Sequence, residues 1–376
     1  MKGVLFSTCY LSLFFLISIL FVFKLSIRRR RNKSKLNNLP PSPPKLPIIG
    51  HLHLLGTLPH RSLRKLSHKY GDMMLLQLGQ MQTPTLVVSS ADVAMEIMKN
   101  HDLAFSNRPQ LTAAKILLYG CNDVGFGVYG ENWRNKRKII VLQLLSSKRV
   151  QSFSHIREEE VEELIKKLRE ASMSSDACCV NLSKTFISIA NNIVCKCALG
   201  CKFSSAGDSN KTNNKVKELA REVMIQLVSF TVRDYFPWLG WVDILTGKIQ
   251  KYKATFKEMD SLLDEVIEEH RKAEKSESDH HSYNKKDLVD VLLQLQQDDM
   301  FDFELTDNDI KPLLMDMFVA GTDTASVVLD WAFVELMKNP IIMKKVQEED
   351  IDMSEKFGIV TSKKEPLHVK PIAFSF

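Results

Sequence analysis

Cysteine is missing from the last part of this sequence: Cys201 is the last of seven cysteines in a chain of 376 residues. The odd number and uneven spacing argue against a disulfide framework. Acidic residues are absent from residues 1–35, which carry eight lysines and arginines, so the net charge of +6 belongs to the amino terminus. The rest of the chain is close to neutral. Nucleic-acid-binding proteins spread basic side chains over a folded face, so we do not expect nucleic acid as a partner.

The amino terminus contains a long run without charge, residues 3–23. At 1.5 Å per residue, a helix of this length matches a hydrocarbon core of about 30 Å. The alternative is a cleaved signal peptide, but the run exceeds the usual core of about 7–15 apolar residues and no small-residue cleavage site follows. Arg28 to Arg31 come next, and basic clusters stay on the cytosolic side. The pattern predicts a signal-anchor transmembrane helix at residues 1–27, membrane lipid as a partner, and a cytosolic body.

Residues 28–50 combine this basic stop with five prolines between Pro40 and Pro47. Proline fixes φ and removes a backbone donor, which favours a stiff extended hinge. Ligands of proline-binding modules have similar composition, but a hinge is the better interpretation directly after an anchor. Free cysteines also fit a cytosolic body, and His51 is expected to face solvent.

The body reads as mainly α with a small β region. Alternating apolar residues predict two strands, and apolar residues at helical spacing predict a series of helices. The strands are expected at 73–79 and 83–90, and the helices at 60–70, 91–101, 131–147, 155–171, 181–200, 214–232, 249–273 and from 288 onward. We place one domain over 51–349 and a terminal β-hairpin segment of the same domain over 350–376.

A further helix, from Leu313 to Phe333, is apolar nearly throughout but contains Gly321, Thr322, Asp323 and Thr324. Glycine in a helix costs about 1 kcal/mol relative to alanine, and threonine hydroxyls can bond to carbonyls of the preceding turn. One interpretation is a groove with an acid and an alcohol that delivers protons to a bound oxygen species. The other is a close crossing of two helices. The residues alone leave both open.

The ends of this helix are also signalled. Thr306 and Asp309 have the spacing of a capping box, and Lys338-Asn339-Pro340 predicts the end.

The chain resembles the cytochrome P-450 monooxygenases, especially the endoplasmic-reticulum-bound members of plant specialised metabolism. The central stretch Ala320-Gly321-Thr322-Asp323-Thr324 is similar to the family's oxygen-binding motif. The anchor and hinge also match, in the same order as in the family. Three further stretches carry the resemblance: Phe105-Ser106-Asn107-Arg108-Pro109, Trp133-Arg134-Asn135-Lys136-Arg137-Lys138 and Asp234-Tyr235-Phe236-Pro237-Trp238-Leu239-Gly240-Trp241.

The resemblance implies a set of roles and partners. Trp133 and Arg137, one helical turn apart, would hold a propionate of haem b. Ala320 and Gly321 would leave room for dioxygen. Asp323 and Thr324 would relay protons. The implied partners are O2, a small apolar substrate and NADPH-cytochrome reductase, and the implied location is the endoplasmic reticulum membrane.

The family's axial ligand is a cysteine thiolate beyond the oxygen-binding helix, and here no cysteine follows Cys201. The chain resembles the family to Glu349 and from Asp350 resembles its carboxyl end, so the resemblance implies that an internal segment with the ligand is skipped and that the fold is truncated. No protein ligand to a metal is therefore assigned. Two hypotheses follow: a haem-dependent monooxygenase hydroxylating a small apolar metabolite, or a catalytically inactive membrane-anchored fragment of one. A non-enzymatic scaffold has no positive feature in its favour.

Overall fold

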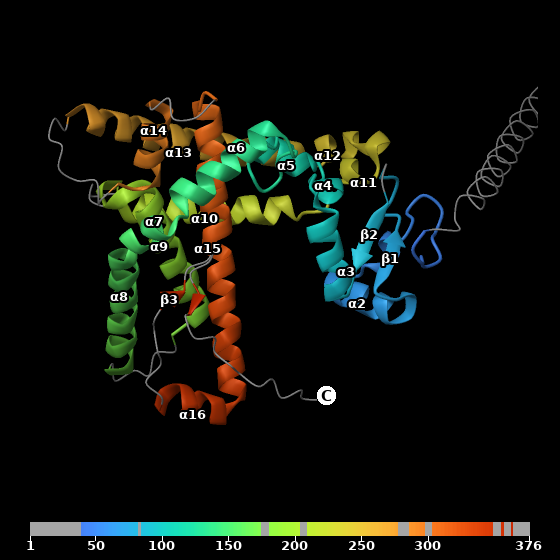
Figure 1. Ribbon diagram of the computed structural model, residues 1–376, viewed down its shortest axis with the longest axis horizontal. Helices are drawn as coiled ribbons and strands as arrows, with labels where there is room; N and C mark the ends of the chain where they lie inside the picture. Colours follow the sequence, from blue (N-terminus) through green and yellow to red (C-terminus); the bar gives the residue numbers. More distant parts are fainter. Residues whose placement is uncertain are drawn as a thin grey trace, which may run out of the picture. The chain divides into compact units, whose positions relative to one another are not determined.

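The computed structural model describes residues 39–81, 84–173, 180–203, 209–276, 286–297, 303–348, 355–356 and 362–363. The predicted anchor at 1–27 lies outside this part of the chain. Backbone contacts divide the chain into two units, one of residues 1–105 with 235–237 and one of residues 106–234 with 238–376. Both units consist mainly of helices, and each also contains a two-stranded antiparallel sheet, in line with the mainly α fold with a small β region that the sequence predicts (Figure 1).

The first unit is built around a two-stranded sheet. Strand β1 pairs antiparallel with β2, with Met73 opposite Val88, and Met74 and Leu76 are buried. The bounds are η1 Leu52–Leu54, α2 Pro59–Tyr70, β1 Met73–Leu76, β2 Thr85–Val88, α3 Ala91–Met95, the π-helix η2 Glu96–Asn100 and α4 Asp102–Phe105.

The proline-rich segment is hydrogen-bonded to this unit. The Leu75 amide donates to Pro41 O at 2.9 Å. His51, expected at the surface, is buried: its Nδ1 accepts from the Gln77 amide at 2.7 Å and its Nε2 lies 2.8 Å from Pro43 O. Accepting at Nδ1 puts the ring proton on Nε2, which donates to the carbonyl. The prediction for His51 was wrong. The carbonyl of Pro43 accepts a hydrogen bond from the His51 ring, so the ring is satisfied although it is buried.

The second unit contains the remaining helices. Its elements are α5 Thr112–Leu117, α6 Glu131–Ile139, the π-helix η3 Ile140–Leu144, α7 Ser147–Ser152, α8 Ser154–Met173, α9 Leu182–Phe203, α10 Ser209–Leu227, α11 Val232–Tyr235 (shared with the first unit), η4 Pro237–Leu239, α12 Trp241–Leu245, α13 Lys248–Ser276, α14 Leu288–Gln297, α15 Asp307–Lys338, α16 Pro340–Glu348, β3 Glu355–Lys356 and β4 Ser362–Lys363. Helix α10 ends at Leu227, five residues short of its predicted end, and a short turn precedes α11.

The core of this unit surrounds the first half of α15, the long orange helix in Figure 1. Helices α9, α10 and α14 pack on α15, and α13 packs on α5, α10 and α14. The buried cluster includes Leu199, Leu263, Leu292, Leu314 and Phe318, each at most 3% exposed. Burying such a side chain stabilises the fold by about 1.5–3 kcal/mol. These contacts fix α15 in place.

The carboxyl-terminal segment is described only at β3 and β4, which pair antiparallel with Glu355 opposite Lys363. The rest of the predicted hairpin at 350–376 lies outside the described residues. Within the described part of the chain, α15 alone is long and apolar enough to cross a bilayer. Its first half is buried in protein, as in the core helix of a soluble domain.

Candidate functional site

Helix α15 carries the candidate site and begins as predicted. Thr306 is its N-cap, and the Thr306 amide donates to Asp309 Oδ2 at 3.1 Å, which completes the predicted capping box. The helix ends at Lys338, with Asn339 as its C-cap and Pro340 opening α16. Pro312 lies in the second turn, where the loss of one intrahelical hydrogen bond is tolerated because the helix continues without interruption to Lys338.

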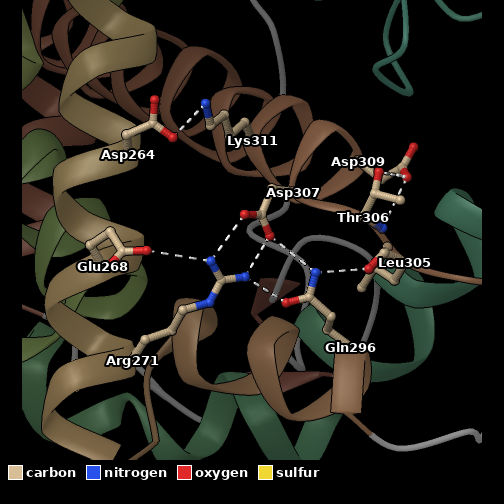
Figure 2. Close-up of polar contacts among 9 residues, drawn as sticks. All are labelled: Asp264, Glu268, Arg271, Gln296, Leu305, Thr306, Asp307, Asp309 and Lys311. Carbon is tan, nitrogen blue, oxygen red and sulfur yellow. Dashed lines mark hydrogen bonds and ion pairs between the residues drawn. The ribbon is translucent and has the colours of Figure 1, made fainter.

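Polar side chains connect the start of α15 to α13 and α14 (Figure 2). Arg271 on α13 donates to both carboxylate oxygens of Asp307, at 3.0 and 2.6 Å. Gln296 on α14 donates to Asp307 Oδ1 at 3.0 Å and to Leu305 O at 2.9 Å. The hydrogen bonds from Arg271, followed by those from Gln296, lower the pKa of Asp307. The two parallel hydrogen bonds from Arg271 to Asp307 are the strong, bidentate form of an arginine–carboxylate contact. They fix the direction in which α15 starts.

Lys311, one turn further, is buried on the same helix. Its Nζ lies 2.7 Å from Asp260 Oδ1 and 2.6 Å from Asp264 Oδ1, both on α13 (Asp264 is drawn in Figure 2). Burial lowers the pKa of Lys311, but the two carboxylates outweigh it and the net shift is upward. The amine is therefore charged, and it holds α15 against α13.

The motif residues divide between two sides of α15. Gly321 faces α9: a Cβ placed there would lie 2.8 Å from Val194 Cγ2, closer than real Cβ atoms come. Thr322 is also buried, and its hydroxyl oxygen has no hydrogen-bond partner in the described part of the chain. At Gly321 the structure therefore shows a close helix crossing, which was one of the two interpretations of this glycine.

Ala320 and Thr324 lie on the other side, and both are exposed. They are one turn apart and share a face. Thr324 Oγ1 donates to Ala320 O, the back-bonding expected from the sequence. Asp323 is partly exposed, and its carbonyl accepts from Ser326 Oγ at 2.9 Å. Small side chains and an alcohol thus line an open face without interrupting the helix.

Trp133 and Arg137 lie together on α6, as their spacing predicts. The Arg137 guanidinium carbon is 5.2 Å from the centre of the Trp133 ring, a cation–π distance. Trp133 Nε1 donates to Val124 O at 3.0 Å. Arg137 is exposed, so its donors are accessible to an anionic group such as a propionate. Among the described residues, no hydrogen bond, ion pair or ring contact joins this pair to the motif on α15.

Lys136, between these two residues, is a site that the sequence interpretation missed. It is 1% exposed. Its Nζ donates to Asn122 O at 2.7 Å, contacts Asn122 Oδ1 and pairs with Asp309 Oδ1 at 2.8 Å. The signal was present: Lys136 lies three and four residues before the apolar Ile139 and Ile140, on the buried face of α6. Lys136 joins α6 to the start of α15.

The described cysteines test whether this chain can hold iron through sulfur. Cys121 and Cys195 are buried. Burial, together with the negative charge of Asp123, raises the pKa of Cys121 to about 11, and burial raises the pKa of Cys195 to about 12. Both are therefore neutral thiols at pH 7, whereas the metal ligand is the thiolate. The exposed guanidinium of Arg137 would suit a haem propionate and the open face of α15 would leave room beside the cofactor, but neither of the two buried thiols offers the thiolate that the iron would need.

The chain is similar to a known protein family both in sequence and in fold. Residues 40–355 match the family model for cytochrome P450, and the chain belongs to the cytochrome P450 family. A zebrafish cytochrome P450 solved with progesterone superposes with a TM-score of 0.58 over 77% of this chain and 63% of its own, at 23% identity. At that identity the likeness concerns the fold alone.

The relatives by sequence are plant proteins. Phenylacetaldehyde oxime monooxygenase CYP71AN24 of Prunus mume is 46% identical over 89% of this chain and 62% of its own length. Cytochrome P450 71A9 of Glycine max is 45% identical over 96% of this chain and 72% of its own. Strychnine-11-hydroxylase of Strychnos nux-vomica is 42% identical over 88% and 62%. The chain thus spans about two thirds of the length of these relatives.

Proposed function

We propose that the chain provides the dioxygen-facing part of a haem-dependent monooxygenase that hydroxylates a small, largely apolar specialised metabolite. In this reaction O2 and two electrons from NADPH convert a C–H bond to C–OH, and the second oxygen atom leaves as water with two protons. The observation that carries the proposal is the exposed face formed by Ala320 and Thr324 on a helix whose first half is fixed in the core. Family membership and plant relatives with monooxygenase and hydroxylase names support it.

The chain's own residues would have distinct tasks. Ala320 has a short side chain and would leave space beside the helix. Gly321 lacks a side chain, which allows α9 to approach α15 closely. Thr324 presents a hydroxyl and Asp323 a carboxylate on a helix that cannot shift easily, and such groups hold and transfer protons. Arg137 offers donors to an anionic substituent of the cofactor. Haem b, when bound, supplies the oxygen chemistry.

The proposed setting includes a membrane. The uncharged run at 3–23 would anchor the chain in the endoplasmic reticulum, with the body in the cytosol beside an NADPH-cytochrome reductase. The same proposal divides the chain into an anchor at 1–27, a hinge at 28–50, a domain at 51–349 and a terminal segment of that domain at 350–376.

A second candidate function rests on a specific observation. The sequence has no cysteine after Cys201, and the described buried cysteines are neutral thiols. The 376-residue polypeptide would then be a catalytically inactive, membrane-anchored fragment of such an enzyme. Without a thiolate there is no donor of electron density for O–O cleavage.

One assay separates the two candidates. The full chain is expressed in membranes with a plant reductase, haem precursor and NADPH, and product is measured with phenylacetaldehyde oxime, the compound in the Prunus mume relative's name, and with a panel of small apolar compounds. That relative is the positive control. Product formation that is lost in Thr324→Ala supports the monooxygenase. Absence of product and of substrate-dependent NADPH oxidation across the panel, with the relative active in parallel, supports the inactive fragment.

A further inference from the structure

Two carboxylates converge on the loop that leads into α6. Asp316, on α15, accepts from the Val124 amide through Oδ2 at 2.8 Å. Asp123, in the loop, accepts from the Phe126 amide through Oδ2, also at 2.8 Å. A Cβ built on Gly125 would lie 3.1 Å from Asp123 Oδ2 and 3.6 Å from Asp316 Oδ1. The two carboxyl groups therefore flank the same peptide, one from the loop and one from the central helix.

The surroundings of the pair are short of partners. Asp123 is 2% exposed, and its Oδ1 has no hydrogen-bond partner in the described part of the chain. A buried carboxylate oxygen without a donor is costly when charged and much less so when protonated. The positive charge acting on both carboxyl groups is that of Lys136 on α6, and Lys136 is already paired with Asp309. Two negative charges would exceed the compensation available.

The titration of the pair agrees with this geometry. Burial and then the charge of Asp123 raise the pKa of Asp316 to about 7. Burial likewise raises the pKa of Asp123, against the opposing effects of backbone donors and Lys136. Because the charge of Asp123 raises the pKa of Asp316, the two groups titrate as a pair, and the proton belongs to both.

The loop is also strained where it begins. Tyr119 and Cys121 have φ of +50° and +64°, with Gly120 at +76° between them. Non-glycine residues are strained in this region and persist there only when contacts beyond them hold the backbone. The Asp316–Val124 hydrogen bond is such a contact, from an element far away in sequence.

Val124 links the acid pair to the candidate cofactor residue. Its amide donates to Asp316, and its carbonyl accepts from Trp133 Nε1 at 3.0 Å. We propose that Asp123 and Asp316 share one proton, and that this singly protonated pair positions Trp133 by holding the Val124 peptide against α15. The statement that the position of Trp133 matters for haem rests on the proposed function. The shared proton and the fixed loop do not depend on it.

The first experiment measures amide exchange of the loop in the full chain, purified in detergent without haem. Asp316→Ala removes the acceptor and is expected to speed exchange at Val124 about tenfold or more, after correction for the intrinsic rate. Asp316→Asn keeps an amide oxygen as acceptor and is expected to exchange like the wild type at pH 6. Quenching of Trp133 fluorescence, isolated by difference from Trp133→Phe, should rise in the alanine variant and not in the asparagine variant.

The second experiment tests the proton by denaturation across pH. A carboxyl whose pKa rises from 3.8 to about 7 on folding binds more protons in the native state, so its contribution to stability falls as pH rises through that window. The wild-type denaturation midpoint should therefore drop relative to Asp316→Asn between about pH 4 and pH 7 and run parallel above it. Glu335→Gln, at an exposed position on the same helix, should keep the wild-type profile.

Either of two results would overturn the proposal: an asparagine variant with the wild-type pH profile, or an alanine variant with unchanged exchange at Val124. A haem titration of the same variants is scored separately. If the loop and proton behave as expected but haem does not bind, the positioning stands and the proposed function fails.

Discussion

From Leu313 to Phe318, α15 buries most of its apolar side chains, with Leu314 and Met315 at 0% exposure. Further along the same helix, Val328 is 67% exposed and Trp331 63%. The sequence is apolar in both halves, so the difference lies in the neighbours. Helices α9, α10 and α14 pack on α15. Helix α9 also reaches the second half, where the rings of Phe186 and Phe333 lie 5.2 Å apart, but among the described residues one face of that half stays open.

The open face is continuous with the candidate site. Ala320, Thr324, Val328 and Trp331 follow one another at spacings of four, four and three residues, and thus share a face of the helix. Exposed apolar stripes of this kind mark surfaces that another group covers. The packed half therefore fixes the helix in space, while the open half presents the residues proposed to take part in the chemistry.

Truncation of Leu314 should give the largest effect. Leu314→Ala leaves a cavity in the core and is expected to lower the free energy of unfolding by about 2–5 kcal/mol. Val328→Ala, the matched control on the open half, should change it by less than about 0.5 kcal/mol. Both are measured by denaturant titration of the full chain. Equal effects at the two positions would remove the distinction between the halves.

The ion pairs at the two ends of α15 sharpen the same contrast. Lys311→Met removes a buried amine bound to Asp260 and Asp264 and should cost about 1–3 kcal/mol, below the range for fully buried pairs because both carboxylates are partly exposed. Lys338→Met breaks an exposed pair with Glu335 and should cost about 0–0.5 kcal/mol. A Lys338 effect as large as that of Lys311 in thermal unfolding would contradict the assignment.

The glycine in the motif gives a smaller effect. Gly321→Ala gains about 1 kcal/mol of helix propensity but clashes with Val194, a cost of about 1–3 kcal/mol. We expect net destabilisation of about 1 kcal/mol. In a Val194→Ala background the same change should be neutral or stabilising, giving a coupling of about 1–2 kcal/mol in a double-mutant cycle. Additive effects would mean that the helices are not in contact there.

The smallest effect is expected at Thr324. Its side chain is exposed, and within the part of the chain that the structure describes it bonds only to its own helix, so Thr324→Ala should alter the free energy of unfolding by less than about 0.5 kcal/mol. The measurement is again denaturant titration. A loss above about 1 kcal/mol would show that Thr324 supports the fold, and its assignment to proton transfer would lose its basis.

Much of the fold was predictable because it depends on local signals. Thr306, Asp309 and Pro340 define the ends of α15 through contacts within a few residues. The spacing of Trp133 and Arg137 predicts their shared face for the same reason.

The remaining features depend on neighbours distant in sequence. Val194 as the partner of Gly321, and Asp316 as the acceptor for Val124, follow only from how α9 and the loop before α6 meet α15. Lys136 carried a readable signal in its helical spacing, but the carboxylate that permits its burial, on Asp309, is far away in the chain. A charged residue on an apolar face can be interpreted only once its partner is known.

The most direct test asks whether these 376 residues can supply sulfur to iron. The chain is expressed in membranes with haem precursor, reduced and exposed to carbon monoxide, with Cytochrome P450 71A9 as the positive control. We predict no absorption typical of thiolate-bound haem, since the buried cysteines remain protonated. A full thiolate spectrum would contradict the account, and its loss in Cys121→Ser or Cys195→Ser would identify the thiol that supplies the ligand.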